Sequence, residues 1–284
     1  MLTFEKEVRV VKDVQGQEFY ANNIPDALEA ALKAAAGGGY VASFPQLVHA
    51  RLITENGSDP IWQKWWTANG SENVGKTKQG KPVVLTINGQ LPSPDRIRQA
   101  LREGLIGGRM QHTDEEFQYM LTDPNVPELS YKEVKEGKNL PILYRVVTDF
   151  NEEAKLPSGY EPIDRWRGNQ RFIIRAGGEE KANQILDRSA QVYNTKKYGN
   201  WTFFKDANPD KPQGLVPVLG DGGDYGFDGS FLGSNVRFGG VAPEALVARE
   251  KFAPTLEQIS DAMTDLIAPK NMDLVQERLR QLYK

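Results

Sequence analysis

The chain contains no cysteine, and its only histidines are His49 and His112. Without cysteine it forms no disulfide and no thiolate metal site, and it has no cysteine nucleophile. Two histidines cannot build a three-histidine metal centre, and a Ser-His-acid triad would have to use one of them. Neither lies in a G-x-S-x-G or H-E-x-x-H pattern, so we interpret both as structural or surface residues rather than catalysts.

Long apolar runs and a strong excess of one charge are also lacking. No segment approaches the roughly 18 apolar residues of a membrane-spanning helix. The first residues, MLTFEKEVRVV, carry charges where a signal peptide is apolar. The net charge of −3 at pH 7 is too small to indicate nucleic acid or a membrane surface as a partner. The sequence therefore predicts a cytoplasmic protein.

The composition is otherwise that of a folded protein, with 284 residues of which 39% are hydrophobic and 26% charged. This length accommodates one large domain or two ordinary ones, each with its own core. We predict a single domain over residues 1–250, with a candidate sub-boundary near 125–140. A C-terminal helical pair over residues 251–284 is predicted to pack on this domain or on a partner.

Helix start signals recur along the chain, as polar caps, prolines in the first turn and capping boxes. They predict helices at 25–36, at 45–54, at 61–69, after Ser93, after Thr113, after Ser130 and at 179–193. Apolar and β-branched runs predict a hairpin at 3–20 and strands at 82–88, 140–150, 171–177, 201–204 and 215–219. Because helices and strands do not alternate regularly, we predict an α+β fold with a mixed or mostly antiparallel sheet and several short helices.

Residues 70–77, GSENVGKT, match the P-loop pattern G-x-x-x-x-G-K-[ST] at every fixed position. A P-loop follows a strand and opens a helix, so that backbone N–H groups surround the phosphates. Here the preceding residues have a helical pattern, and Pro82 and a strand follow. The best Walker-B candidate, ending at Asp149, is interrupted by Arg145 and Thr148. We therefore interpret the segment as an exposed basic loop rather than a nucleotide site.

Lysines and tryptophans around this segment form a candidate anion site. Lys76, Lys78 and Lys81 lie close together and follow a stretch containing Trp62 and Trp66. Basic groups beside exposed aromatic rings bind anions, nucleotides or single-stranded nucleic acid by charge and stacking. The alternative interpretation is that the tryptophans belong to the core and the lysines are solvated.

Aspartates in the glycine-rich segment GDGGDYGFDGS form a candidate metal site, with Asp221, Asp224 and Asp228 as ligands. Carboxylates on a bendable loop are what Mg²⁺ or Ca²⁺ binds, although the spacing differs from that of an EF-hand. Aspartate and glycine also dominate turns for conformational reasons, so a structured surface loop is the alternative.

The last segment, 255–284, is amphipathic, with Leu256, Ile259, Met263 and Leu266 at helical spacing. Such a helical pair docks on its own domain or on a second copy of the chain, which makes a homo-oligomer a candidate assembly.

These patterns predict a binding or assembly protein without an evident catalytic centre, whose surface includes residues 62–81 and 206–240 and whose ligand is a small anion. One alternative is a magnesium- or calcium-dependent hydrolase or transferase acting on a phosphorylated or sugar substrate. Its metal would lie on the three aspartates and its anion on Lys76 or Lys78. A weaker alternative is nucleic-acid binding through the tryptophans and lysines. Whether the protein is an enzyme stays open.

Overall fold

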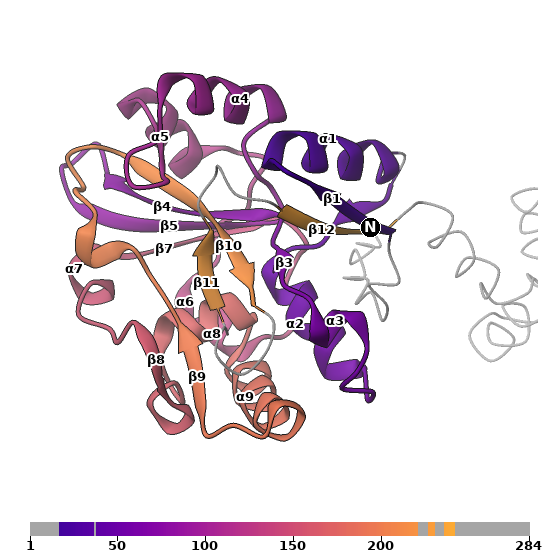
Figure 1. The fold of residues 1–284 in the computed structure, drawn as a ribbon. Helices are drawn as coiled ribbons and strands as arrows, with labels where there is room; N and C mark the ends of the chain where they lie inside the picture. The colour runs from indigo at the N-terminus through magenta and orange to yellow at the C-terminus, as the bar shows by residue number, and fades with distance from the viewer. Residues whose placement is uncertain (1–16, 37, 221–226, 231–235, 242–284) are drawn as a thin grey trace, which may run out of the picture. The chain divides into compact units, whose positions relative to one another are not determined.

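The computed structural model describes residues 17–36, 38–220, 227–230 and 236–241. They form an α+β fold, which confirms the predicted fold class (Figure 1). All of them belong to one compact unit, residues 1–242. The predicted C-terminal helical pair, with Leu256, Ile259, Met263 and Leu266, lies outside the described residues, as does the first strand of the predicted hairpin.

The larger sheet is mostly antiparallel, and its described strands follow the order β7-β5-β4-β10-β11-β9-β8, with β3 and β6 also paired to β10. Their bounds are Tyr144–Asp149 (β7), Pro82–Asn88 (β5), Gly70–Lys76 (β4), Gln213–Leu219 (β10), Phe227–Ser230 (β11), Lys197–Asn200 (β9), Gly159–Pro162 (β8), Trp66–Thr67 (β3) and Met110–Gln111 (β6). A smaller antiparallel sheet joins β1 (Gln17–Ala21), β12 (Val236–Val241) and β2 (Tyr40–Val41).

Each helix that a cap signal predicts begins at that cap. Asn23 caps α1 by accepting a hydrogen bond from the Asp26 backbone N–H, and capping boxes begin α2, α5 and α6. The α-helices are Ile24–Ala34 (α1), Phe44–Ile53 (α2), Pro60–Gln63 (α3), Pro94–Glu103 (α4), Asp114–Thr122 (α5), Tyr131–Glu136 (α6), Phe150–Glu153 (α7), Gln170–Ala176 (α8) and Glu179–Tyr193 (α9). Local signals sufficed here because a cap and its helix lie within one turn of each other.

The interpretation of residues 70–77 as an exposed basic loop is wrong. Residues 70–76 form the strand β4, which pairs with β5 on one side and β10 on the other. A turn at 77–81 connects β4 to β5 as a hairpin. The polar side chains Ser71, Glu72 and Asn73 are buried. Residues far away in the sequence bond to Glu72 and Asn73, and Asn73 in turn bonds to Ser71. Those partners are invisible in a local pattern, which is why the segment resembles a loop.

Both glycines of the P-loop pattern serve close packing in this strand. A Cβ atom on Gly70 would lie 2.6 Å from the carbonyl oxygen of Ile87. A Cβ atom on Gly75 would lie 2.6 Å from the ring of Phe117 on α5. Gly70 and Gly75 therefore match the P-loop pattern for a different reason: without a side chain, they let β5 and α5 approach β4 closely.

Three other predicted elements are also wrong. The helix expected at 61–69 ends at Gln63, because Trp66 and Thr67 pair with β10 as β3. Residues 171–176 belong to the helix α8 instead of a strand: Asn169 caps its start, and Gly177 ends it in the left-handed conformation. A short apolar run is compatible with a buried strand or a buried helix, so periodicity alone does not separate them. Residues 201–204 lie just beyond the strand β9.

The strands β5, β4 and β7 present two different faces. Register places Ser71 opposite Ile87 and Asn73 opposite Leu85, so these side chains share the face that α5 covers. Glu72 lies opposite Thr86, on the face that α8 covers. Figure 1 shows α4 and α5 on one side of these strands and α6 and α8 on the other. Neighbouring residues of β4 therefore serve two separate polar clusters.

Candidate binding pocket

A cavity of about 200 Å³ lies where β4, β5 and β6 meet α4 and α5, and we call it the α4–α5 pocket. Most of its wall is apolar and consists of Ile87, Leu91, Pro92, Met110, Met120 and Val126. Tyr119 of α5 also lines it and is 61% exposed, so its ring is accessible to an incoming molecule. The polar wall includes Ser71, Arg96, His112, Glu116 and Asp123.

A chain of hydrogen bonds joins the polar side chains on the sheet side of the pocket. The Nδ2 amide of Asn73 donates to Ser71 Oγ at 2.8 Å and to the Leu85 carbonyl oxygen at 3.3 Å. Because a carbonyl only accepts, these bonds fix the orientation of the Asn73 amide. Its Oδ1 therefore accepts from His112 Nε2 at 3.0 Å. In the neutral imidazole this leaves Nδ1 of His112 as a hydrogen-bond acceptor.

His112 is held in the neutral form by its surroundings. Burial lowers its pKa to about 4, the positive charge of Arg96 acts in the same direction, and Glu116 opposes both. A Cβ atom on Gly214 of β10 would lie 2.0 Å from Asn73 Oδ1 and 2.9 Å from His112 Nε2. The hydrogen bond between Asn73 and His112 therefore requires glycine at position 214.

An ion pair between α4 and α5 closes another side of the pocket. Arg96 Nε donates to Glu116 Oε1 at 2.7 Å, and Arg96 Nη2 donates to Glu116 Oε2 at 3.0 Å and to the Gln111 carbonyl at 2.8 Å. Glu116 also accepts from the backbone of Thr113 as part of the capping box. The hydrogen bond from Arg96 lowers the pKa of Glu116. These two charges compensate each other.

Asp123 carries a charge that is not compensated in this way. Its Oδ1 accepts from the backbone and side chain of Asn125, at 2.9 and 3.0 Å, and only 8% of the residue is exposed. Within the part of the chain that the structure describes, no basic side chain forms an ion pair with it. Arg145 donates to the Asp123 backbone carbonyl at 2.8 Å, but its charge is paired with Glu128 at 3.2 Å.

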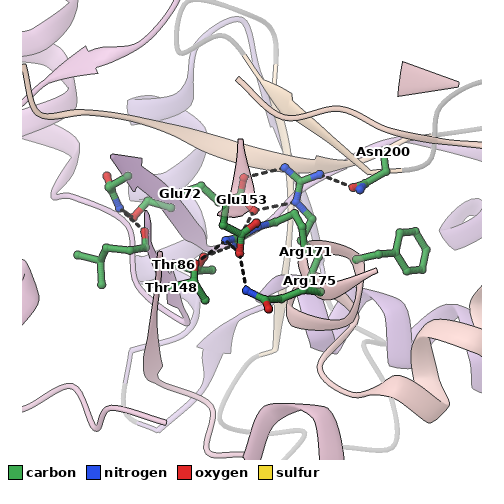
Figure 2. Close-up of polar contacts among 12 residues, drawn as sticks. Glu72, Thr86, Thr148, Glu153, Arg171, Arg175 and Asn200 are labelled. Carbon is green, nitrogen blue, oxygen red and sulfur yellow. Dashed lines mark hydrogen bonds and ion pairs between the residues drawn. The ribbon is translucent and has the colours of Figure 1, made fainter. Parts of the chain in front are cut away.

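On the opposite face of β4, a buried ionic network joins the sheet to α8 (Figure 2). The guanidinium of Arg175 donates to both carboxylate oxygens of Glu72 at 2.7 Å and to Asn200 Oδ1 at 2.7 Å. Glu72 has no exposed surface and Arg175 is 1% exposed. Burial alone would raise the pKa of Glu72, but the charges and hydrogen bonds of Arg175 and Arg171 outweigh it and lower that pKa.

The second arginine of this network, Arg171, ties three more elements together. It bonds Glu153 of α7 at 2.8 and 3.1 Å, Thr86 of β5 at 2.5 Å and Thr148 of β7 at 3.3 Å. Figure 2 shows these side chains converging from the sheet and the helices. Two arginines and two glutamates compensate each other, and all four are closed to solvent. We therefore assign the network to holding the sheet and α8 in register.

The residues of the predicted anion site lie in two separate places. Lys76 pairs with Asp210, Lys81 with Asp149 at 3.5 Å, and Lys78 is exposed at the hairpin turn.

Trp62 and Trp66 are buried in the core cluster that α2, α8 and α9 share. Trp66 pairs with Leu219 and Val74 with Gln213. Positions six residues apart along a strand such as β10 are about 20 Å apart. The structure thus does not bring the tryptophans beside the lysines.

The predicted metal site is mostly outside the described residues. Asp221 and Asp224 lie there, and Asp228 belongs to β11 without a described side chain. Among the described residues, no group of three or more histidines, aspartates and glutamates is arranged to hold a metal ion. No helix of that same part is long and apolar enough to cross a bilayer. A divalent metal on the three aspartates stays a prediction.

Sequence reasoning missed Ser71, Asn73, Arg96 and Asp123 and interpreted His112 as a structural or surface residue. One signal was available: Ser71, Asn73 and Gly75 alternate with Glu72 and Val74, as in a strand with two different faces. The same residues match the P-loop pattern, which favours a loop interpretation over a strand. Nothing local to Asp123 marks it as part of a pocket, because the pocket forms only when α4 and α5 pack on the sheet.

Comparison with known proteins shows a similarity of fold to a solved structure. No model of a known protein family matches the chain, and a search of curated proteins finds no match. That solved structure is described by the phrase "Accommodation of massive sequence variation in Nanoarchaeota by the C-type lectin fold". The TM-score is 0.64 at 26% identity, and the match covers 80% of this chain and 98% of the nanoarchaeal one. The similarity fits the α+β architecture and is compatible with a binding protein.

Proposed function

We propose that this protein is a binding protein that recognises a small organic group in the α4–α5 pocket. The observation that carries the proposal is the pocket itself, a mostly apolar cavity of about 200 Å³ with a few fixed polar groups. Such a composition is typical of sites for small molecules, in which apolar walls supply affinity and polar groups supply orientation. A cavity of roughly 150 Å³ is enough to hold benzene, so one ring with a substituent fits here.

The hydrogen-bond arrangement supports binding rather than nucleophilic catalysis. A serine nucleophile needs a base that accepts its proton, with the serine hydroxyl as the donor. Here Ser71 Oγ accepts from Asn73, and the Nε2 nitrogen of His112 is engaged by Asn73 as well. The three side chains therefore form a fixed wall, in which His112 positions Asn73 and Asn73 positions Ser71.

The similarity to the nanoarchaeal protein supports a scaffold role for the fold. That fold is described as accommodating massive sequence variation, so the residues on it, rather than the fold, would determine what each protein binds. For this chain the ligand must accordingly be argued from its own pocket residues.

The proposal is tested by titrating the full chain with benzyl alcohol, an uncharged probe of one ring, and recording ¹³C-methyl spectra of labelled methionine. Two of the five methionines, Met110 and Met120, line the pocket and report on its occupancy. We expect both of their signals to shift with a common dissociation constant. If the signals of Met110 and Met120 stay unchanged up to the solubility limit of the probe, the proposed function is wrong.

Tyr119→Ala provides the matched variant. Removing the exposed ring should weaken benzyl alcohol binding severalfold, since an aromatic pair contributes about 0.5–1.5 kcal/mol. Tyr119→Phe should bind as the parent does, because the ring is retained. Tyr20→Ala is the control, as Tyr20 is 51% exposed and belongs to β1 rather than to the pocket. Equal effects of the two alanine variants would contradict the assignment of this pocket.

A further inference from the structure

The charges that line the α4–α5 pocket do not balance. Arg96 is matched by Glu116 at 2.7 Å, which leaves the carboxylate of Asp123 as an additional negative charge. Arg145 lies close to Asp123, but Glu128 compensates its charge. The charged side chains that line the pocket are thus two carboxylates and one guanidinium, set in a mostly apolar wall.

This excess charge selects the charge of a ligand. Burying a carboxylate without a nearby cation costs free energy, because the carboxylate loses its hydration. A cationic ligand that pairs with the carboxylate offsets part of this cost. An anionic ligand would bring a second negative charge into the same apolar space and would be repelled. The small predicted anion therefore does not suit this pocket.

The other polar groups favour a ligand that donates hydrogen bonds. Nδ1 of His112 is an acceptor, because Nε2 donates to Asn73. The exposed ring of Tyr119 offers an aromatic face, which attracts organic cations. The pocket is therefore lined by a carboxylate, a hydrogen-bond acceptor and an aromatic ring, from Asp123, His112 and Tyr119 respectively. Each of the three interacts favourably with a cation that donates hydrogen bonds.

We propose that the group bound in the α4–α5 pocket is an organic ammonium: a protonated amine on an apolar body about the size of one ring, paired with the carboxylate of Asp123. This inference rests on the proposed function and adds the chemical class of its ligand. The ammonium would be presented either by a free arylalkylamine, such as benzylamine, or by a lysine side chain, and the ammonium chemistry is common to both.

The test uses three probes that share one ring and differ in charge: benzylamine, benzyl alcohol and benzoate. With the methionine signals as readout, we expect benzylamine to bind about tenfold more tightly than benzyl alcohol, because hydrogen bonds to a charged partner are the stronger ones. Benzoate should bind most weakly of the three. n-Butylamine, with the stem of a lysine side chain, identifies the source: tighter binding than benzylamine indicates lysine, and weaker binding indicates an arylalkylamine.

Asp123→Asn removes the charge and keeps the oxygen that accepts from Asn125. This variant should lose the tenfold preference for benzylamine while binding benzyl alcohol as before. Asp114→Asn, the same change on an exposed residue of α5 outside the pocket, should keep the preference.

Two failures are distinguishable. If benzoate binds as tightly as benzylamine, or if Asp123→Asn leaves the preference intact, the ammonium inference is wrong while the binding pocket stands. If none of the probes shifts Met110 or Met120, the proposed function itself is wrong.

Discussion

His112 makes the stability of the protein depend on pH. Its pKa is lowered from 6.5 to about 4 by burial in the folded protein, whereas the unfolded chain titrates normally. As pH falls below about 6.5 the unfolded state binds a proton first, so the contribution of His112 to stability is full above this pH and is lost on approaching pH 4. A shift of this size corresponds to about 3 kcal/mol.

The measurement is the free energy of unfolding by denaturant between about pH 7 and pH 4, for the parent and for His112→Gln. Glutamine retains an amide donor near the place of Nε2 but does not titrate. We expect the free energy of unfolding of the parent, relative to that of His112→Gln, to fall by about 3 kcal/mol between about pH 7 and pH 4. Parallel pH profiles would show that the imidazole is not held neutral.

At the scale of residues, sequence reasoning succeeds where both partners lie within one turn. Asn23 and Thr113 were predicted as caps because a cap bonds a backbone N–H two or three residues away. Asn73 was not recognised, because its partners Leu85 and His112 lie 12 and 39 residues away. The same distance in sequence hides the pocket role of Asp123.

At the scale of elements, β4 is fixed to α8 by the pair between Glu72 and Arg175. Glu72→Gln should destabilise the protein by about 3–5 kcal/mol, because it leaves a buried guanidinium without its compensating charge. The matched control is Glu128→Gln, which removes a carboxylate that is 53% exposed from the pair with Arg145. It should cost less than about 1 kcal/mol. Similar unfolding free energies for the two variants would contradict the assigned role of the network.

Elements were predictable to the extent that their signal is local. The strand β5, PVVLTIN, was predicted with its observed bounds because β-branched residues dominate it. The strand β4 was not, because partners far away in the sequence stabilise its buried polar residues: Glu72 bonds to Arg175, 103 residues later, and Asn73 to His112, 39 residues later. The sequence of α8 favours a strand, because residues 171–176 are all buried and show no amphipathic period.

At the scale of the whole molecule, one thermal-shift assay tests both the P-loop match and the aspartate cluster. Magnesium-ATP should raise the melting temperature no more than magnesium alone does, because residues 70–76 are already paired with β5 and β10. If the aspartates hold a metal, magnesium or calcium alone should raise it, and Asp224→Asn should abolish the rise. If ATP raised the melting temperature above its value in magnesium alone, and Lys76→Ala abolished that rise, the result would support the nucleotide interpretation.

The α+β class of the molecule followed from the irregular order of helices and strands, whereas the pocket did not follow from any motif. It arises where α4, α5 and three strands meet, and its residues come from segments between positions 71 and 126. Only the packed fold brings Ser71, His112 and Asp123 around one cavity.

The most direct test of the binding pocket is a search for nuclear Overhauser contacts between the ring protons of bound benzylamine and the methionine methyl groups. The account predicts contacts to both Met110 and Met120, because both side chains line the α4–α5 pocket. Contacts to neither methyl group, from a probe that is demonstrably bound, would place the ligand elsewhere and contradict the account.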